Sequence, residues 1–158
     1  KNKGKKKNLI NVKNKEIFKK DKIFCSFNVG TNFEIRNNLF EKIKKREDID
    51  IHYSNNSIEY LNQLSEYKYN LCPVGNGFDT HRIWETLLVD SIPIVERNNV
   101  NINFSNLGVP ILMLDKWDDL SSLTLNNLNN LNNKNKGIDI FRFTQFDFWW
   151  NKIISKKP

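Results

Sequence analysis

The sequence predicts an α/β protein with a doubly wound, mostly parallel sheet, and two observations support this prediction. Short apolar runs alternate with amphipathic helical patterns along most of the 158 residues, an order typical of helices that cover both faces of a parallel sheet. In the segment 68–96, an apolar run, a glycine turn, a helical pattern and a second apolar run follow one another. This is the order of a β-α-β unit, which places the turn and the helix start at the carboxyl edge of the sheet, where ligands bind.

The composition is that of a single globular domain. Hydrophobic residues make up 39% of the chain and aromatic residues 12%, which is enough for one core at this length. No apolar run reaches the length of a membrane span, and the lysine-rich start lacks the apolar block of a signal peptide. We therefore expect a cytoplasmic protein without a membrane span. Cys25 and Cys72 lie in apolar runs without metal-ligand spacing, and we expect them to be buried free thiols.

The positive charge is concentrated at the start of the chain. Residues 1–22 contain ten of the 25 basic residues and two of the 18 acidic ones, which leaves 15 basic and 16 acidic residues for the remainder. The net charge of +7 therefore arises from a basic, Lys- and Asn-rich leader over residues 1–22. The folded domain is expected over residues 23–158, and its near-neutral charge argues against specific binding of nucleic acid.

The first half of the domain is expected to contain two strand–helix repeats. The predicted strands are residues 23–29 and 49–53, and the predicted helices are residues 32–46 and 57–67. The first helix has apolar residues at helical spacing, and Thr31 with Glu34 fits a capping box at its start. The side chains expected to face inward from the second helix are Ile58, Leu61 and Leu64.

The second half of the domain has less regular patterns. Residues 98–108 are expected to form a loop with a helical turn at 104–107, and residues 109–114 to form a strand. A helix is predicted over residues 117–131, fraying in the low-complexity segment 126–135, followed by a terminal helix over residues 140–154. Six aromatic residues fall in that last segment: Phe141, Phe143, Phe146, Phe148, Trp149 and Trp150. We expect them to cover this domain's own surface or to contact a partner.

The glycine turn of the β-α-β unit carries the residue types of an anion site. Gly75, Asn76 and Gly77 tolerate tight turns and let a ligand approach the backbone closely. Asp79 or Thr80 can cap the helix that follows. Because the N-terminus of a helix presents free N–H groups and a partial positive charge, phosphate groups bind well there.

Arg82 and Glu85 extend this site into the helix. The guanidinium group of Arg82 suits phosphate oxygens. A carboxylate repels phosphate, so Glu85 is suited instead to accept hydrogen bonds from hydroxyl groups such as those of a ribose. Together they describe a site for a nucleoside diphosphate, although on spacing alone the two side chains can equally form an ordinary i,i+3 ion pair.

The same residues resemble the donor-binding motif of the exostosin-like glycosyltransferases and, more distantly, that of the GT-B fucosyltransferases. Members show Pro-x-Gly, a short polar loop, Arg-x-x-Glu and a later Ile-Pro-Val-like run. The matching positions are Pro73, Gly75, Arg82, Trp84, Glu85, Leu87, Pro93 and Val95. Asp90 and Ser91 replace the Gly or Gly-Cys often found there, which is a mild departure. The segment 27–30 with Arg36 resembles the first strand and loop of the same nucleotide-binding half. The likeness spans residues 23–150, and only the central motif is specific.

This resemblance implies a Rossmann-like domain that is the donor half of a GT-B glycosyltransferase. Such a domain binds a UDP- or GDP-linked sugar and needs no metal and no cofactor. The resemblance implies that Arg82 contacts the diphosphate, that Glu85 contacts the ribose hydroxyls and that residues 75–77 lie under the phosphates. The further donor contacts that it implies are Gly30, Arg36, Asp79 and His81. Retaining enzymes often carry a second glutamate eight positions before the first, where this chain has Gly77, so an inverting transfer is favoured.

One domain of this kind leaves the acceptor side of the reaction open. GT-B enzymes have two such domains, and the first usually contributes the acceptor contacts and often the general base. We therefore expect a glycan or protein acceptor, held with the help of an acceptor-binding domain or a second chain, and no catalytic residue is assigned. A catalytically inactive nucleotide-sugar-binding or interaction module of the same fold is the alternative. A nucleic-acid-associated protein that uses its lysine leader is a third hypothesis.

Overall fold

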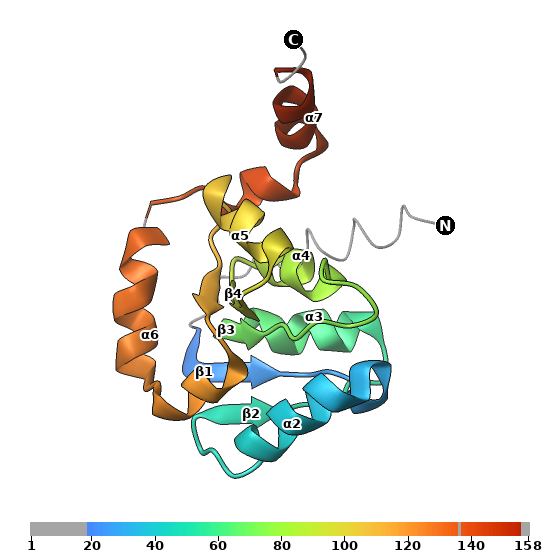
Figure 1. Ribbon diagram of the computed structural model, residues 1–158, viewed down its shortest axis with the longest axis vertical. Helices are drawn as coiled ribbons and strands as arrows, with labels where there is room; N and C mark the ends of the chain where they lie inside the picture. Colours follow the sequence, from blue (N-terminus) through green and yellow to red (C-terminus); the bar gives the residue numbers. More distant parts are fainter. Residues whose placement is uncertain (1–18, 136, 156–158) are drawn as a thin grey trace.

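The computed structural model describes residues 19–135 and 137–155, and the strands within them form one parallel sheet (Figure 1). The strand order is β2-β1-β3-β4-β5, and every neighbouring pair is parallel. The strands are β1 (Lys20–Cys25), β2 (Ile49–Ile51), β3 (Tyr67–Leu71), β4 (Ile92–Glu96) and β5 (Leu112–Leu114). The prediction of a doubly wound, parallel α/β sheet is confirmed.

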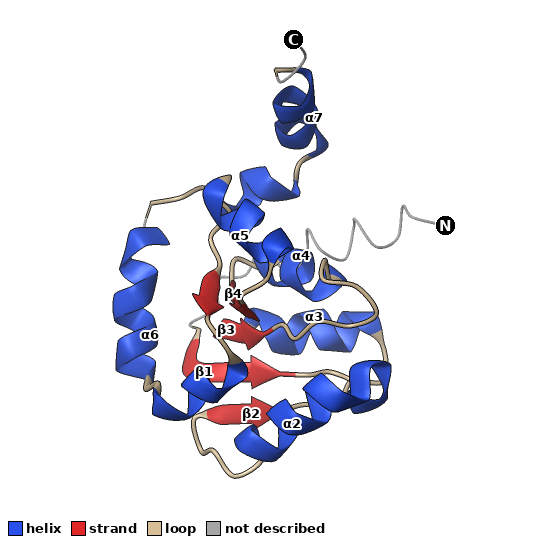
Figure 2. Cartoon of the chain, in the orientation of Figure 1, coloured by secondary structure: helices blue, strands red, loops and turns tan. Residues whose placement is uncertain are grey.

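Helices cover both faces of this sheet (Figure 2). The first half contains η1 (Val29–Asn32), α2 (Phe33–Ile43), α3 (Ser57–Ser65) and α4 (His81–Leu88), where η marks a 3-10 helix. The second half contains α5 (Asn99–Asn106), η2 (Trp117–Ser122), α6 (Leu125–Asn132), η3 (Asn133–Asn135), η4 (Ile140–Thr144) and α7 (Phe146–Ile154). Within residues 19–135 and 137–155, none of the helices has the length and apolar character needed to cross a membrane.

The alternation of side chains along each strand explains why the sheet has two apolar faces. Ile23 and Cys25 of β1 belong to one core cluster, which α2, η2 and α6 cover. Phe24 lies between them in sequence and faces the opposite side, where it packs with Tyr60 and Leu64 of α3. Ile92–Val95 of β4 are buried on both faces of the sheet, so this strand appears in the sequence as a continuous apolar run and not as an apolar–polar alternation.

The chain reverses its winding direction between β1 and β3, and this position determines where the candidate site lies. From β1 the chain passes through α2 to β2 at the edge, and then returns through α3 to β3 on the other side of β1. The loops that follow β1 and β3 therefore diverge over opposite faces of the sheet. Such a switch point leaves a crevice at the carboxyl edge of the sheet.

The first strand begins earlier than the sequence analysis predicts. It starts at Lys20 and ends at Cys25, whereas the predicted strand covers residues 23–29. Lys20 pairs with Tyr67 at the start of β3, and its side chain forms an ion pair with Glu66 at 2.7 Å. Residues 20–22 thus belong to the sheet and not to a leader separate from the domain. Residues 1–18 of the leader, which is predicted over residues 1–22, lie outside the described residues.

Two predictions about helix ends and faces in the first half are wrong. Asn32, not Thr31, precedes α2, and no side chain caps that helix, because η1 occupies the preceding residues. The capping bond of this region is instead made by Asn28, whose Oδ1 accepts a hydrogen bond from the Gly30 N–H at 2.8 Å. In α3, Ile58 is 48% exposed, and the inward position is taken by Tyr60.

Asparagine residues make the second half more helical than predicted. The expected loop over residues 98–108 is the helix α5, because Asn98 caps it and the buried Asn101 donates a hydrogen bond to the Glu96 carbonyl at 2.8 Å. The expected helix over residues 117–131 is two helices, separated where Thr124 caps α6. The predicted fraying from residue 126 is wrong, since α6 continues to Asn132 and its Leu128 is fully buried.

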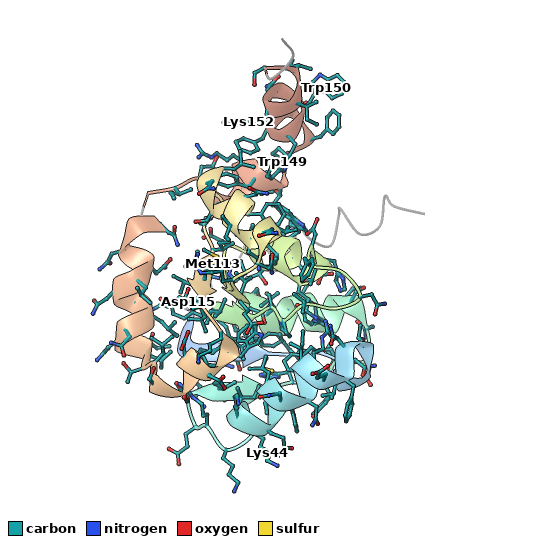
Figure 3. The ribbon with its side chains drawn as sticks, viewed as in Figure 1. Lys44, Met113, Asp115, Trp149, Trp150 and Lys152 are labelled. Atoms are coloured by element: carbon teal, nitrogen blue, oxygen red, sulfur yellow. The ribbon has the colours of Figure 1, made fainter. Side chains whose placement is uncertain are left out.

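The terminal aromatic segment divides into a buried part and an exposed part. The predicted helix over residues 140–154 breaks at Gln145 into η4 and α7, and α7 extends away from the sheet (Figure 1). Phe143 is fully buried, and Trp149 lies where α7 meets η4, with its Nε1–H donating to the Phe143 carbonyl at 2.8 Å (Figure 3). Phe146 and Trp150 are 73% and 50% exposed and stack on each other. The segment therefore covers this domain's own surface and also leaves an apolar stripe exposed.

We expect a Lys19→Met substitution to destabilise the fold. The Lys19 ammonium donates to the carbonyls of Val89, Ser65 and Tyr67 and to the hydroxyl of Ser91, at 2.9, 3.2, 3.4 and 2.8 Å respectively. Methionine keeps the aliphatic length but removes the ammonium donor from the Val89 and Ser65 carbonyls, while the Tyr67 carbonyl keeps the Ser91 hydroxyl as a donor. The free energy of unfolding should therefore fall by about 1–3 kcal/mol. Urea denaturation of both proteins measures this difference. Lys22→Met is the matched control, because the Lys22 side chain is 44% exposed in its pair with Asp50 and should change stability by less than about 1 kcal/mol.

The same lysine should give the protein a characteristic dependence of stability on pH. Burial lowers the pKa of Lys19 from 10.5 to about 8, and Asp90 opposes this shift. The folded chain thus holds this proton more weakly than the unfolded chain, so its free energy of unfolding rises as the pH increases from about 8 to 10.5. The rise should be absent from Lys19→Met. An equal rise in both proteins would show that other groups cause it.

Candidate functional site

Two adjoining cavities lie at the carboxyl edge of the sheet. The smaller, of about 270 Å³, is bounded by the loop after β1, the loop after β3 and the first turn of α4. The larger, of about 660 Å³, lies over the ends of β1 and β2 beside α2. Asn28 and Arg82 line both cavities, so the two cavities are neighbours at these residues. The predicted site residues that line the smaller cavity are Arg36, Gly75, Asn76, Gly77, Asp79, His81 and Arg82.

Arg36 fastens the two loops of the smaller cavity to each other. It extends from α2 and is only 4% exposed. Its Nη1 donates to the Asn28 carbonyl after β1 at 2.8 Å, while Nε and Nη2 donate to the Val74 and Pro73 carbonyls after β3 at 2.9 and 3.4 Å. Arg36 therefore fixes the width of the crevice at the switch point, a role that the resemblance does not imply.

The glycine turn over residues 75–77 packs closely against Arg36. The Gly75 N–H donates to the Gly77 carbonyl at 3.2 Å, and the Gly75 carbonyl accepts from Asn32 Nδ2 at 3.1 Å. Both polar groups of the Gly75 backbone are thus used within the protein. A Cβ atom at this position would lie 3.1 Å from Arg36 Nη2, whereas one at Gly77 would meet nothing within 4 Å. Close packing therefore favours a glycine at position 75 but not at position 77.

We expect Gly75→Ala to weaken ligand binding at this cavity and Gly77→Ala to leave it nearly unchanged. The added methyl group at position 75 presses on the Arg36 guanidinium and must displace either that group or the loop. A displacement of a few tenths of an ångström should reduce the affinity for UDP by about three- to tenfold, equivalent to about 1 kcal/mol. Calorimetric titration of the two variants tests this. Equal affinities for the two variants would show that the contact at Gly75 is unimportant for binding.

Arg82 lies in the first turn of α4 and contributes to both cavities. Its guanidinium lies over the Tyr60 ring, 5.4 Å from the centroid, and its buried Nε has no hydrogen-bond partner within the part of the chain that the structure describes. Burial and the nearby Arg82 lower the pKa of Arg36. Two guanidinium groups that repel each other at one cavity favour the binding of an anion there.

The acidic and imidazole groups beside the cavity have defined contacts. Asp79 Oδ1 accepts a hydrogen bond from Trp84 Nε1 at 2.8 Å, which joins the loop to α4. His81 is exposed, and its Nε2 lies 3.9 Å from Glu85 Oε2 one turn further along the helix. Glu85 is 29% exposed at its side chain and is not among the residues that line either cavity.

Gly30 is not a lining residue, although its neighbours Val29 and Thr31 are, and the structure adds residues that sequence reasoning missed. Gly30 lies in η1 and is not part of either lining. Thr80 lines the smaller cavity as the residue that precedes α4; its Oγ1 is buried and makes no hydrogen bond to any described residue. His52 and Tyr53, which follow β2, line the larger cavity. They belong to no recognisable sequence motif. They line the same cavity as Arg82 only because the strand order of the sheet brings the ends of β2 and β3 to the same edge.

The two cysteines do not contribute a nucleophile to this edge of the sheet. Both are buried, and burial raises the pKa of each thiol to about 12. They are therefore protonated and unreactive at neutral pH, as expected for buried free thiols. Residues 19–135 and 137–155 contain no group of three or more His, Cys, Asp or Glu side chains that is arranged to hold a metal ion.

Comparison with known proteins identifies the family from which this site comes. The model of the RXYLT1 C-terminal domain matches residues 34–152, which is about three-quarters of the chain. A search among curated proteins found no match. The matched segment includes α2 with Arg36, the glycine turn and all of α4.

Proposed function

Because the chain belongs to the family of the RXYLT1 C-terminal domain, whose members are exostosin-like glycosyltransferases, we propose that it binds the nucleotide-sugar donor of a sugar transfer. The observation that carries this proposal is the pair of guanidinium groups, Arg36 and Arg82, at one cavity beside the N-terminus of α4. That cavity lies at the switch point of a parallel sheet, where phosphate-bearing ligands bind in doubly wound folds.

In this proposal the diphosphate of the donor occupies the smaller cavity. Arg82 contacts its oxygens directly, and the N–H groups at the start of α4 contribute further donors. Arg36 acts mainly by holding the two loops, since three of its N–H groups already bind carbonyls. Glu85 accepts hydrogen bonds from hydroxyl groups of the donor. The two arginines supply the positive charge that a diphosphate requires, so the proposed donor, linked to UDP or GDP, needs no metal ion.

For the transfer itself we propose an inverting reaction that also requires residues from outside this domain. Inversion needs an acceptor held in line with the anomeric carbon and a base to take its proton. The Asp79 carboxylate accepts a hydrogen bond from Trp84, and the His81 side chain is largely exposed beside Glu85. We take these contacts to favour donor binding over proton abstraction at this site. The same observation keeps a second candidate function open, namely a catalytically inactive nucleotide-sugar-binding module.

Calorimetric titration of the chain with UDP and with GDP tests donor binding. We expect saturable binding of at least one nucleotide, with an affinity that weakens as the salt concentration rises because the contact is ionic. Failure of a folded chain to bind either nucleotide would refute the proposal. Release of nucleotide from UDP- or GDP-sugars, measured with and without acceptors, then separates a complete enzyme from a domain that binds donor without transfer.

A further inference from the structure

We propose that Asn76 is a site of spontaneous deamidation, which converts its carboxamide to a carboxylate within the smaller cavity and so weakens the binding of a diphosphate there. Asn76 and Gly77 form the one Asn-Gly pair in the sequence, and both line that cavity. An asparagine deamidates fastest when glycine follows it. The reason is that glycine has no Cβ atom to hinder the attacking backbone nitrogen and leaves the backbone free to turn.

The fold leaves both reacting groups of this pair free. Asn76 and Gly77 are exposed and lie outside any helix or strand, in the loop between β3 and α4. Within residues 19–135 and 137–155, no residue forms a hydrogen bond with the Asn76 carboxamide or with the Gly77 N–H. A Cβ atom at Gly77 would meet nothing within 4 Å. The peptide between the two residues therefore has room to turn until the Gly77 nitrogen reaches Cγ of Asn76.

Asn56 shows how the fold can protect an asparagine from the same reaction. It also precedes a small residue, Ser57. Its Oδ1, however, accepts hydrogen bonds from the N–H groups of Ile58 and Glu59 at 3.1 and 3.0 Å, because Asn56 caps α3. These bonds hold the carboxamide away from the nitrogen that would attack it. Asn56 is therefore an internal control within the same chain.

The reaction requires only water and hydroxide. Hydroxide removes the proton of the Gly77 N–H, and the nitrogen then forms a bond to Cγ of Asn76. The bond between Cγ and Nδ2 breaks, and Nδ2 leaves as ammonia after taking a proton from water. Water then adds to either carbonyl of the resulting succinimide ring and breaks its bond to nitrogen. The product is aspartate or isoaspartate, and no atom is oxidised or reduced.

The new carboxylate changes the charge of the smaller cavity. It lies in the same lining as Arg36 and Arg82, where it competes with a diphosphate for the two guanidinium groups and repels it. Isoaspartate also adds one carbon atom to the backbone of the loop that Arg36 holds. This consequence rests on the proposed function, because it assumes that the diphosphate occupies this cavity. A bound phosphate that accepts the Gly77 N–H should in turn slow the reaction.

The first experiment follows the modification itself. The wild-type chain and Gly77→Ala are incubated in warm, mildly alkaline buffer made with heavy-oxygen water, with and without UDP or GDP. Peptide mapping by tandem mass spectrometry then measures labelled aspartate and isoaspartate at positions 56 and 76. We expect both products at position 76 of the wild type and little change at position 56. The reaction should be at least about fivefold slower in Gly77→Ala, and a bound nucleotide should slow it in the wild type.

The second experiment measures the effect on binding. UDP and GDP are titrated calorimetrically into the fresh wild type, the incubated wild type, Asn76→Asp and Asn76→Gln. Asn76→Asp introduces the charge without the extra backbone carbon, and Asn76→Gln changes the side chain without adding charge. We expect Asn76→Asp to bind the preferred nucleotide at least about fivefold more weakly than either the fresh wild type or Asn76→Gln. The incubated wild type should lose binding in proportion to its modified fraction.

Several outcomes would contradict the proposal. An intact Asn76 after incubation, or equal rates at Asn76 and Asn56, would show that this loop does not promote deamidation. Equal rates in the wild type and Gly77→Ala would exclude attack by the Gly77 nitrogen as the limiting step. If Asn76→Asp binds nucleotide as tightly as Asn76→Gln, the carboxylate does not act on the diphosphate site. If the fresh wild type binds no nucleotide, the proposed function and this effect on binding fail, whereas the labelled products still test the modification.

Discussion

Replacing Arg36 with methionine should unfold or strongly destabilise the domain, and this is the largest effect on stability that we expect from a single substitution. Methionine fills much of the same buried volume but removes every donor. The Pro73 and Val74 carbonyls then lose the donor that Arg36 provides, and the Asn28 carbonyl keeps only the Thr31 N–H at 3.3 Å. At about 1 kcal/mol or more for each lost hydrogen bond, the free energy of unfolding should fall by about 3 kcal/mol, a large part of the total for a domain of this size. Urea denaturation followed by circular dichroism measures it.

Two further variants, one at Arg36 and one at the surface, determine whether Arg36 stabilises the fold through its geometry or through its charge. Arg36→Lys keeps a positive charge but cannot bridge carbonyls from two loops in a planar fork, so it should recover only a small part of the lost stability. Arg97→Met is the matched surface control, because Arg97 is 50% exposed in its pair with Asp115 and should change stability by less than about 1 kcal/mol. Similar losses in Arg36→Met and Arg97→Met would show that Arg36 does not clamp the loops.

The fold and the centre of the site are predictable from sequence because their signals are local. The run of glycine turn, helix and Ile92–Glu96 strand lies within thirty residues, so its arrangement follows from neighbouring residues alone. The cavity at the glycine turn, with Arg82 in the first turn of α4, follows from that arrangement. The family match over residues 34–152 is consistent with the same interpretation.

The parts that could not be predicted depend on contacts between distant segments. Arg36 reaches Val74 only because β1 and β3 are neighbours in the sheet, and nothing in either segment specifies that adjacency. Tyr53 and Arg82 line the same cavity for the same reason. The helix α5 differs from its prediction for another reason. Its asparagines have low helix propensity, and Asn101 overcomes this through a buried hydrogen bond to the last residue of β4.

The two arginines of the smaller cavity therefore differ in role although both are predicted from the same resemblance. Arg36 is buried and uses its donors on backbone carbonyls of two loops, so its loss should appear first as lost stability. Arg82 is half-buried and contributes to both cavities, with its Nε unpaired among residues 19–135 and 137–155. Its loss should appear first as lost binding.

Arg82→Ala is expected to produce the largest loss of nucleotide affinity. A charge-assisted contact to phosphate contributes about 1.5–3 kcal/mol, so the dissociation constant for UDP or GDP should increase at least tenfold. Arg82→Lys should fall between the alanine variant and the wild type, because a lysine offers a point charge without the two parallel donors of a guanidinium. Calorimetry on the three proteins at one salt concentration gives these ratios.

Phe78→Ala is the control for this prediction, since Phe78 is 59% exposed in the loop before α4 and lines neither cavity. It should change nucleotide affinity less than threefold, about 0.6 kcal/mol. The guanidinium lies over the Tyr60 ring, and such an interaction contributes only about 1 kcal/mol to stability. The denaturation midpoint of Arg82→Ala should therefore remain close to that of the wild type. A large fall in stability with unchanged affinity would instead assign Arg82 to the fold and leave the diphosphate without its main contact.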